Sequence, residues 1–252
     1  MKTLATDLDG TIYIEDRLIK DVKESHNKLI KENFRIIYTT NNSSVHPIKI
    51  ANKLENLLNT EIEPETIVTP LKVLSKFIKN KNIKFYIHGT EELINFVSEI
   101  ATVTTSIHDS EMILIGRKEI INTKEINEII KFVKNGKKIM GMNKDLSFPS
   151  YDNKEKIGNG AVIKLIEDEL NINIKSFGKP ESLYSEYIKK KYKDIDFMIG
   201  DRVDTDILLG NNIDATTFLV TSSIKNYMED SIADYNFNNF SECVSFILKN
   251  SK

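Results

Sequence analysis

The sequence predicts an α/β protein with a parallel sheet and a second, smaller α/β unit that begins after residue 79. Short β-rich apolar segments alternate along the chain with longer segments whose apolar residues recur at helical spacing. The alternation pauses at the polar residues 79–82 and then restarts with a new strand-like segment. Because a strand, helix, strand order brings two strands together in parallel through a right-handed crossover, the polar residues that follow the strands are expected at one edge of a sheet.

The two periodicities place the individual elements. Helical spacing predicts helices at residues 19–32, 47–58, 65–80, 90–100, 123–135, 161–170 and 184–192, and near the C-terminus. β-rich apolar runs predict strands just before Asp7 and at residues 34–38, 83–87, 111–115, 137–142, 196–199 and 215–220. Turn-forming residues at 143–149 and in Gly158-Asn159-Gly160 predict loops before the helix at 161–170.

The bulk composition is typical of a globular protein that contacts neither nucleic acid nor a membrane. Of 252 residues, 40% are hydrophobic and 29% are charged, and 35 Lys and Arg oppose 37 Asp and Glu, for a formal net charge of -2. This balance lacks the basic excess that nucleic acid or an anionic membrane attracts. No run approaches the roughly 18 apolar residues of a membrane span, and no apolar leader segment opens the chain, so we expect a cytoplasmic protein.

The single cysteine, Cys243, excludes an internal disulfide and fits a reducing compartment. It lies in a stretch with the apolar spacing of an amphipathic terminal helix, which favours a packed thiol over a catalytic one. The four histidines show no spacing typical of metal ligands, and we assign them no role.

Two carboxylates follow the first expected strand, in the segment Asp7-Leu8-Asp9-Gly10-Thr11. Residues two apart in a strand point to the same side, so Asp7 and Asp9 start as neighbours, and Gly10 allows a sharp turn after them. Such a segment also suits a solvated turn. Because two close carboxylates repel, a divalent cation between them is the usual solution, and Mg²⁺ prefers one or two carboxylates together with substrate phosphate oxygens. The pair therefore indicates a metal-assisted phosphoryl site.

A second polar segment, residues 39–44, follows the next expected strand. It is expected at the same sheet edge as Asp7, where open α/β sheets bind ligands. Thr40 and Asn41 suit a phosphate, because a hydroxyl and an amide donate to its oxygens without adding charge.

The same segment has a second interpretation as a helix cap. Ser43 or Ser44 could cap the expected helix at 47–58. Capping and phosphate binding are compatible, since a helix N-terminus is itself an anion site.

The last third of the chain carries a lysine and a second acidic cluster. Lys179 stands between a glycine and a helix-initiating proline. Its ammonium would then lie near the positive end of a helix dipole, an unfavourable place that an anion in front of it would offset. The alternative is a lysine that points to water. Asp201 and Asp206 follow another strand and could complete a metal site with Asp7, while Asp204 could point outward.

Four segments in the order DLDGT, TTNN, GKP and GDRVDTD resemble the haloacid dehalogenase-like superfamily of aspartate-nucleophile phosphatases. The insert between the second and third segments resembles the α/β cap of the NagD-like branch, which includes nitrophenyl phosphatases and phosphoglycolate or pyridoxal phosphate phosphatases. The resemblance implies a Rossmann-like core of residues 1–79 and 177–252 and an inserted cap of residues 80–176.

Carried over to this chain, the resemblance assigns roles to the motif residues. It makes Asp7 the nucleophile and Asp9 the general acid and base. The residues implied to hold the phosphoryl group are Thr40, Asn41 and Lys179, with Asn42 nearby. The implied Mg²⁺ ligands are the Asp7 side chain, the Asp9 main-chain carbonyl and Asp201, with Asp206 supporting the site from behind.

The cap is expected to select the substrate, because the core motifs contact only the phosphate. Asp145 and Phe148 are the candidates, and the alternative for each is a tight structural loop. Some vitamin-phosphate relatives place a histidine where this chain has Phe148, which argues against that substrate. Another departure, Asn212-Ile213-Asp214-Ala215 in place of Ala-Gly, affects packing more than chemistry.

The resemblance thus implies a magnesium-dependent phosphatase that hydrolyses a small phosphate monoester through an aspartyl-phosphate, similar to nitrophenyl or phosphoglycolate phosphatases. A phosphomutase and a catalytically silent phosphate-binding protein stay open as alternatives. A hydrolytic dehalogenase leaves Asp9 without a task, and a phosphoacceptor signalling module is about half this length. The expected partner is a small phosphorylated metabolite, and a homodimer is left open.

Overall fold

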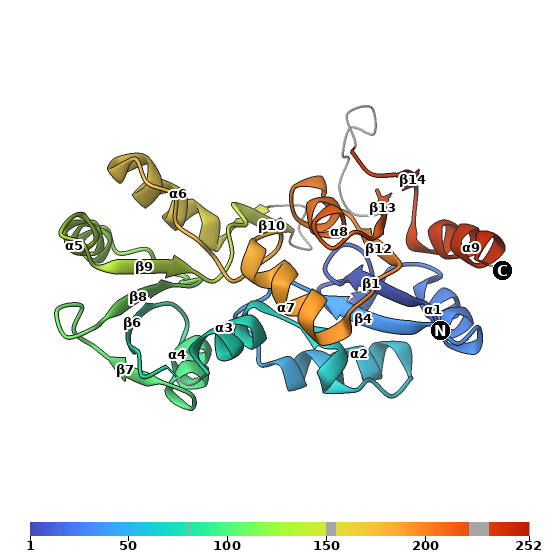
Figure 1. Ribbon diagram of the computed structural model, residues 1–252, viewed down its shortest axis with the longest axis horizontal. Coiled ribbons are helices and arrows are strands. Elements are labelled where there is room, and N and C mark those ends of the chain that lie inside the picture. The colour runs from blue at the N-terminus through green and yellow to red at the C-terminus, as the bar shows by residue number, and fades with distance from the viewer. Residues whose placement is uncertain (80, 150–154, 222–231, 252) are drawn as a thin grey trace.

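Two separate parallel sheets organise the fold, as the computed structural model of the chain shows in Figure 1. It describes residues 1–252 except 80, 150–154, 222–231 and 252. One sheet has six strands and the other four, and each is flanked by helices. The expected α/β fold class, a parallel core with a separate smaller α/β unit, is confirmed.

The six-stranded sheet has the order β14-β13-β12-β1-β4-β5, and all of its neighbouring pairs are parallel. Its strands are β1 (Thr3–Asp7), β4 (Arg35–Thr39), β5 (Ile67–Val68), β12 (Phe197–Gly200), β13 (Thr216–Val220) and β14 (Tyr235–Phe237). Asp7 pairs with Thr39 of β4, and Thr6 pairs with Ile199 of β12. The segments after β1, β4 and β12 therefore leave the sheet at one edge.

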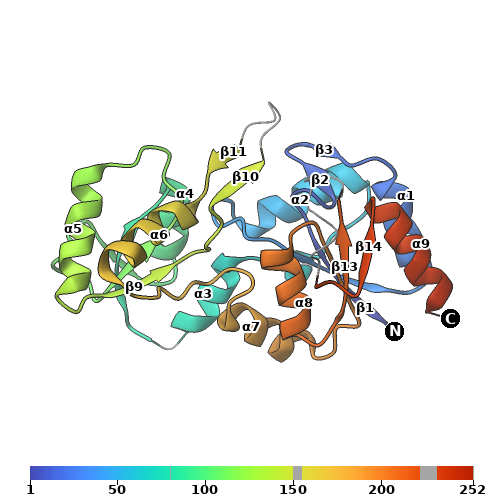
Figure 2. The same ribbon diagram turned by 90° about the horizontal axis from the view of Figure 1, so that it is seen from above.

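Helices cover both faces of this sheet (Figure 2). They are α1 (Val22–Lys31), α2 (Pro47–Leu58), α3 (Pro70–Ile78), α7 (Ser182–Tyr192), α8 (Leu208–Asn212) and α9 (Phe240–Asn250). Leu4 of β1 belongs to a hydrophobic cluster with buried residues of α1, α2 and α9. Its neighbour Ala5 belongs to the cluster that contains residues of α3, α7 and α8. Successive strand residues point to opposite faces, so both faces of the central strand are buried.

The four-stranded sheet has the order β7-β6-β8-β9. Its strands are β6 (Lys84–His88), β7 (Thr102–Thr104), β8 (Met112–Ile115) and β9 (Lys138–Gly141), and its helices are α4 (Glu91–Ser98), α5 (Thr123–Lys134) and α6 (Asn159–Leu170). One hydrophobic cluster joins Phe85 and Leu114 of this sheet to Phe177 and to residues of the larger sheet. The two units therefore share buried apolar contacts.

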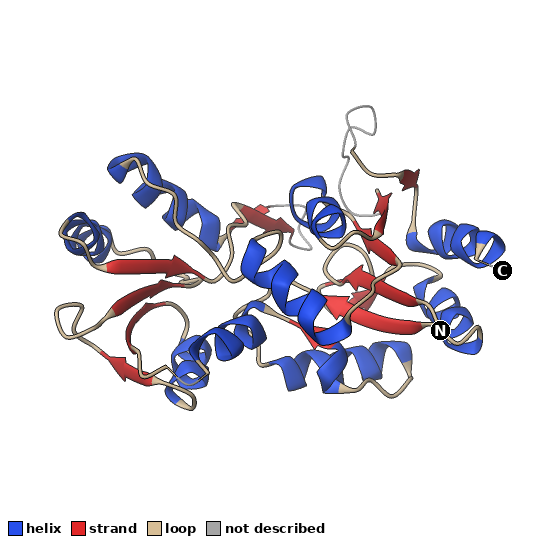
Figure 3. Cartoon of the chain, in the orientation of Figure 1, coloured by secondary structure: helices blue, strands red, loops and turns tan. Residues whose placement is uncertain are grey.

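Two antiparallel strand pairs and two short helical turns complete the described part of the chain. The pairs are β2 (Tyr13–Ile14) with β3 (Arg17–Leu18), and β10 (Ser147–Pro149) with β11 (Glu155–Ile157), the second of which lies between the two sheets (Figure 3). The turns are a 3₁₀ turn at Pro64–Thr66 and a π-helical turn at Val203–Ile207. Among the described residues, none of the helices combines the length and the apolar character that crossing a bilayer requires.

The helix expected at 65–80 is wrong in its first part. Ile67 and Val68 instead form β5, and the helix begins at Pro70. The Thr69 side chain accepts a hydrogen bond from the Lys72 N–H, a helix cap that proline at the next position reinforces. A strand of two residues is too short to show strand periodicity, and β7 and β14, with three residues each, were missed because they are short as well. 

The expected serine cap of α2 is also wrong. The Nδ1 atom of His46 accepts the hydrogen bond from Ile48 N at 3.2 Å, so a histidine that was given no role caps the helix. Cys243, by contrast, is fully buried among apolar side chains, and the expectation of a packed thiol is confirmed. The expected limits of core and cap, 1–79 with 177–252 and 80–176, stay a prediction.

Candidate active site

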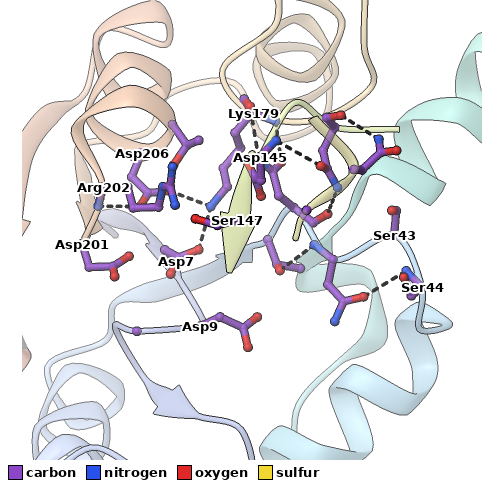
Figure 4. Close-up of a pocket in the computed structure, with 18 of the residues that line it drawn as sticks. Asp7, Asp9, Ser43, Ser44, Asp145, Ser147, Lys179, Asp201, Arg202 and Asp206 are labelled. Carbon is purple, nitrogen blue, oxygen red and sulfur yellow. Dashed lines mark hydrogen bonds and ion pairs between the residues drawn. The ribbon is translucent and has the colours of Figure 1, made fainter. Parts of the chain in front are cut away.

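The polar side chains predicted for the site gather around a cavity of about 240 Å³ between the edge of the six-stranded sheet and the smaller unit. Figure 4 shows Asp7, Asp201 and Asp206 close together, with Lys179 reaching toward them. The predicted residues that line the cavity are Asp7, Asp9, Thr40, Asn41, Asn42, Asp145, Lys179, Asp201 and Asp206. The structure thus brings together segments that lie almost 200 residues apart in the sequence.

Backbone geometry holds the acidic residues in place. Asp7 ends β1, and Asp201 directly follows the adjacent strand β12. Gly10 has φ 98, a left-handed conformation that glycine adopts without strain, and so permits the turn after Asp9. A Cβ atom at Gly200 would lie 2.2 Å from the Cβ of Asp206, so only glycine lets the π-helical turn pack against the strand end.

Lys179 is buried between two carboxylates. Its Nζ donates to Asp7 Oδ1 at 2.7 Å and to Asp206 Oδ1 at 2.6 Å. Burial by itself would lower the pKa of Lys179, but the carboxylates of Asp206 and Asp7 raise it well above its ordinary value. The lysine therefore stays charged, and the anions that it faces include the predicted nucleophile.

One lysine does not balance the carboxylates around it. Burial raises the pKa of Asp7 well above its usual value; Lys179 opposes this rise, and the charges of Asp206 and Asp201 add to it. The site therefore carries excess negative charge when all three carboxylates are ionised.

The same three carboxylates fit a divalent cation. Oxygen atoms of Asp7, Asp201 and Asp206 lie within 4.8 Å of one another. Asp7 Oδ2 is buried and has no hydrogen-bond partner among the described residues. Asp206 Oδ2 accepts from Arg202 N at 3.1 Å, so Asp206 is anchored from both sides. Closely spaced carboxylate oxygens with a spare buried lone pair are suitable ligands for Mg²⁺.

Asp9 lies apart from this cluster, and its carboxyl group points into the cavity (Figure 4). Burial raises its pKa, while the charges of Lys53 and Lys179 and a hydrogen bond with the Thr40 side chain lower it. The net shift favours the protonated form. Asp9 is therefore suited to act as a proton donor beside the predicted nucleophile Asp7, which lies two residues earlier in the chain.

The polar segment after β4 forms a tight turn beside the cavity. Asn42 N donates to Thr40 Oγ1 at 3.0 Å, and Ser44 N donates to Asn42 Oδ1 at 3.0 Å. Thr40 N donates to the hydroxyl of Tyr184 at 3.2 Å, and that hydroxyl donates to Val68 O at 2.8 Å. Tyr184, fully buried on α7, was missed, because an aromatic residue at helical spacing predicts only a core position.

The smaller unit supplies the opposite wall of the cavity. Its lining residues include Arg117, Asn143, Asp145, Ser147 and Asn159. Sequence reasoning named only Asp145 of these, although the Gly158-Asn159-Gly160 segment was a signal for a constrained loop next to a ligand. These side chains are polar, so this wall suits a polar ligand.

Two further sequence expectations concern residues at the edge of the site. Asp204 points away from the cluster, as expected: it is largely exposed and pairs with Arg202, with Nη2 2.7 Å from Asp204 Oδ2. Phe148 lies in β10 opposite Lys156, and its side chain lies outside the described part of the chain. 

Two protein-family models match the chain. A haloacid dehalogenase-like hydrolase model matches residues 4–102, and a HAD-hydrolase-like model matches residues 176–242. The chain is 27% identical over 234 residues to an acid sugar phosphatase of Staphylococcus saprophyticus, covering 88% of this chain and 87% of the relative.

Solved structures share the whole fold. A p-nitrophenyl phosphatase from Archaeoglobus fulgidus superimposes with a TM-score of 0.86 at 22% identity, over 97% of this chain and 98% of that one. A glycerol phosphate phosphatase from Mycobacterium tuberculosis in complex with magnesium superimposes with a TM-score of 0.80 at 20% identity, over 94% of this chain and 74% of that one.

Proposed function

Because the chain belongs to the haloacid dehalogenase-like hydrolases, we propose that it stands on the branch of NagD-like proteins and nitrophenyl phosphatases. We further propose that it is a magnesium-dependent phosphatase that hydrolyses a small phosphate monoester through an aspartyl-phosphate. The expected family and enzyme class are confirmed. The observation that carries the finer proposal is the buried cluster in which Lys179 bridges Asp7 and Asp206 next to Asp201.

Asp7 is the proposed nucleophile. Its Oδ1 is held by Lys179, while its Oδ2 has no hydrogen-bond partner among the described residues and so keeps its lone pairs for the phosphorus atom or a cation. Attack forms a bond from an Asp7 oxygen to phosphorus and breaks the ester bond, which gives an aspartyl-phosphate and an alcohol.

Asp9 is the proposed general acid and base. The raised pKa of Asp9 favours the protonated form, which can donate to the leaving alkoxide in the first step. The carboxylate that remains accepts a proton from water when the aspartyl-phosphate is hydrolysed, so one residue serves both half-reactions.

The phosphoryl oxygens are proposed to bind to Lys179, Thr40, Asn42 and the backbone amide of Asn41. The turn residues are neutral hydrogen-bond donors, and Lys179 carries one positive charge. Together they can bind a phosphate dianion without adding further charged side chains to the site. The side chain of Asn41 is engaged elsewhere in the structure, which is why its proposed phosphate contact is assigned to the backbone.

The proposed Mg²⁺ ligands are Asp7, Asp201 and the main-chain carbonyl of Asp9, with Asp206 in support. When bound, Mg²⁺ supplies positive charge that offsets the repulsion between a phosphate dianion and an anionic nucleophile. The excess of carboxylates over Lys179 and the spare oxygen of Asp7 support this assignment.

A polar leaving group is proposed because the wall opposite the nucleophile is polar. Arg117, Asp145 and Ser147 can each bond to hydroxyl groups. The named relatives act on sugar phosphate or glycerol phosphate, which agrees with such a wall. Asp145 and Phe148 stay the candidates from the sequence for selecting among substrates.

The test is release of inorganic phosphate from nitrophenyl phosphate and from a panel of sugar and polyol phosphates, with Mg²⁺ and after treatment with EDTA. We expect turnover only with Mg²⁺, its loss in Asp201→Asn, and near-normal turnover in the matched control Asp204→Asn, which removes an exposed carboxylate three residues away. Phosphate transfer to a second hydroxyl without release of free phosphate would favour a mutase. Activity that survives EDTA, or that survives in Asp201→Asn, would contradict the proposal.

A further inference from the structure

Asn41 stands where three segments meet: the end of β4, the loop after β9 and the loop that carries Lys179. We propose that Asn41 is a positioning residue: its side chain couples the packing of the loop 143–146 against the end of β4 to the placement of Lys179. The kinetic part of this proposal rests on the proposed phosphatase function, whereas the structural part does not.

On the core side, one amide group holds both main-chain polar groups of Lys179. Lys179 N donates to Asn41 Oδ1 at 2.7 Å, and Asn41 Nδ2 donates to Lys179 O at 3.2 Å. The amide orientation follows from these partners, since a flipped amide would set an NH₂ group against the Lys179 N–H. The main chain from which the buried ammonium extends to Asp7 is therefore fixed by Asn41.

On the cap side, the loop 143–146 closes on the same residue through two hydrogen bonds. Asn41 Nδ2 donates to Asp145 Oδ1 at 2.8 Å, and Asn143 Nδ2 donates to Asn41 O at 2.8 Å. Asp145 N in turn donates to Asn143 Oδ1 at 3.2 Å, which makes the loop one connected unit. When this loop is docked, it therefore satisfies the side chain and the main chain of Asn41 together.

Gly178 gives independent support for this junction, because the three segments approach one another too closely for a side chain at this position. A Cβ atom at this position would lie 2.7 Å from Asn143 Cβ and 2.7 Å from Asn41 Oδ1. Only glycine leaves room for the lysine loop and the loop 143–146 to share Asn41. The glycine of the GKP segment is therefore required for this junction as well as for the chain direction.

The consequence is that Lys179 is best placed when the loop 143–146 is docked. Loss of the Asp145 and Asn143 contacts would leave the Asn41 amide to reorient toward water and to release the main chain of Lys179. Phosphoryl transfer would then be fastest when the cavity is closed by its polar wall, the state in which water competes least.

The sharpest test reverses the contact between Asn41 and Asp145. Asn41→Asp keeps the acceptor for Lys179 N, but it loses the donor to Lys179 O and sets two carboxylates against each other. We therefore expect kcat for nitrophenyl phosphate to fall about tenfold, with a KM change below about threefold. The double variant Asn41→Asp with Asp145→Asn restores a donor and an acceptor at the same net charge. The donor to Lys179 O stays lost in the double variant, so we expect only part of kcat to return, a rise of about threefold over Asn41→Asp.

Hydrogen exchange supplies a readout that does not depend on activity. Peptides that cover residues 141–147 are expected to exchange faster in Asn41→Asp and to regain protection in the double variant. If the parent protein releases no phosphate, the proposed function fails, while the exchange data still decide the coupling.

Controls separate positioning from general destabilisation. Asn239→Ala removes another asparagine side-chain hydrogen bond, the 2.9 Å cap of α9 at Glu242 N, and is expected to leave kcat unchanged. Should Asn41→Asp not fold, Asn143→Ala removes the other bond of the junction and is expected to lower kcat in the same way. An unchanged kcat in the folded variant, a double variant no faster than Asn41→Asp, or unchanged exchange at 141–147 would overturn the proposal.

Discussion

Each of the two parallel sheets ends in a cluster of charged side chains, buried at β1 and partly buried at β6, and the two clusters differ in charge balance. At the end of β6, one carboxylate, Glu125, meets three donors. Tyr86 OH and His88 Nδ1 lie 2.9 Å from Glu125 Oε1, and Lys118 Nζ lies 2.7 Å from Oε2. At the end of β1 the ratio of carboxylates to donors is reversed: the ammonium group of Lys179 bonds to two carboxylates, Asp7 and Asp206, and a third, Asp201, lies close to them.

The pKa shifts of Glu125 and Asp7 follow the ratio of carboxylates to donors in each cluster. Burial opposes ionisation of Glu125, but its hydrogen bonds with Lys118 and His88 hold the pKa of this carboxyl below its usual value. Burial likewise opposes ionisation of Asp7, and there the neighbouring carboxylates leave the pKa well above its usual value. Burial alone thus does not distinguish a structural cluster from a reactive one, whereas an excess of acceptors over donors does.

The largest expected effect comes from removing the charge of Asp7. Asp7→Asn should lower turnover on the order of 10³-fold or more, because an amide is not a nucleophile. The melting temperature of the metal-free protein should stay equal or rise, since the variant relieves repulsion among buried carboxylates.

The matched change in the other cluster is Glu125→Gln. Its turnover should stay within about twofold of the parent, while its unfolding free energy falls by about 1–3 kcal/mol as Lys118 and His88 lose a charged partner. Steady-state kinetics and thermal unfolding of both variants check the pair of predictions. Equal losses of activity would remove the distinction between the clusters.

A buried histidine sharpens the comparison, because among the described residues His26 forms no ion pair. Its Nε2 lies 2.6 Å from Tyr38 OH, and burial lowers its pKa from 6.5 to about 4. The unfolded chain therefore binds the proton first as the pH falls, so stability present above pH 6.5 is lost between about pH 6.5 and 4. At about 1.36 kcal/mol per pKa unit, the loss amounts to about 3 kcal/mol.

Urea unfolding over this pH range, with His26→Gln and the exposed-site control His108→Gln, measures that loss. The slope of the unfolding free energy against pH should become flatter in His26→Gln and stay unchanged in His108→Gln. A parent protein with equal stability at pH 4 and pH 7, or the same slope in both variants, would refute the assignment.

Metal binding should stabilise only one of the two clusters. At about 100 times its Kd, Mg²⁺ should add about 2.7 kcal/mol to the unfolding free energy. The gain should vanish in Asp201→Asn and persist in Glu125→Gln. Thermal unfolding with and without Mg²⁺ measures it, and an undiminished gain in Asp201→Asn would place the cation elsewhere.

The smallest expected effect is that of Lys118→Ala. The lysine side chain is 36% exposed, so solvent screens its pair with Glu125, and the unfolding free energy should fall by less than about 1 kcal/mol. A loss of several kcal/mol in chemical unfolding would show that this pair is as strongly coupled as the one at Lys179.

The convergence of the candidate site residues could be predicted from the sequence because parallel sheets impose a simple geometry. Asp7 ends a strand, and Thr40 and Asp201 each directly follow one. Strands joined by crossovers end at one edge, so their convergence could be predicted without distances. Short elements escaped prediction for the opposite reason. The two-residue strand β5 contains less than one period of any pattern, and the His46 cap depends on a rotamer.

By itself, the sequence determined the α/β class, the family and the chemical types that meet at the site, since strand order and side-chain identity are local properties. Only the tertiary structure decided how those groups are shared. The position of Lys179 between Asp7 and Asp206, and the use of the Asn41 amide to join two loops, depend on distances between segments that lie from 27 to 172 residues apart. Hydrogen bonds and charge interactions act over a few ångströms, so no pattern along the chain reports which partners they join.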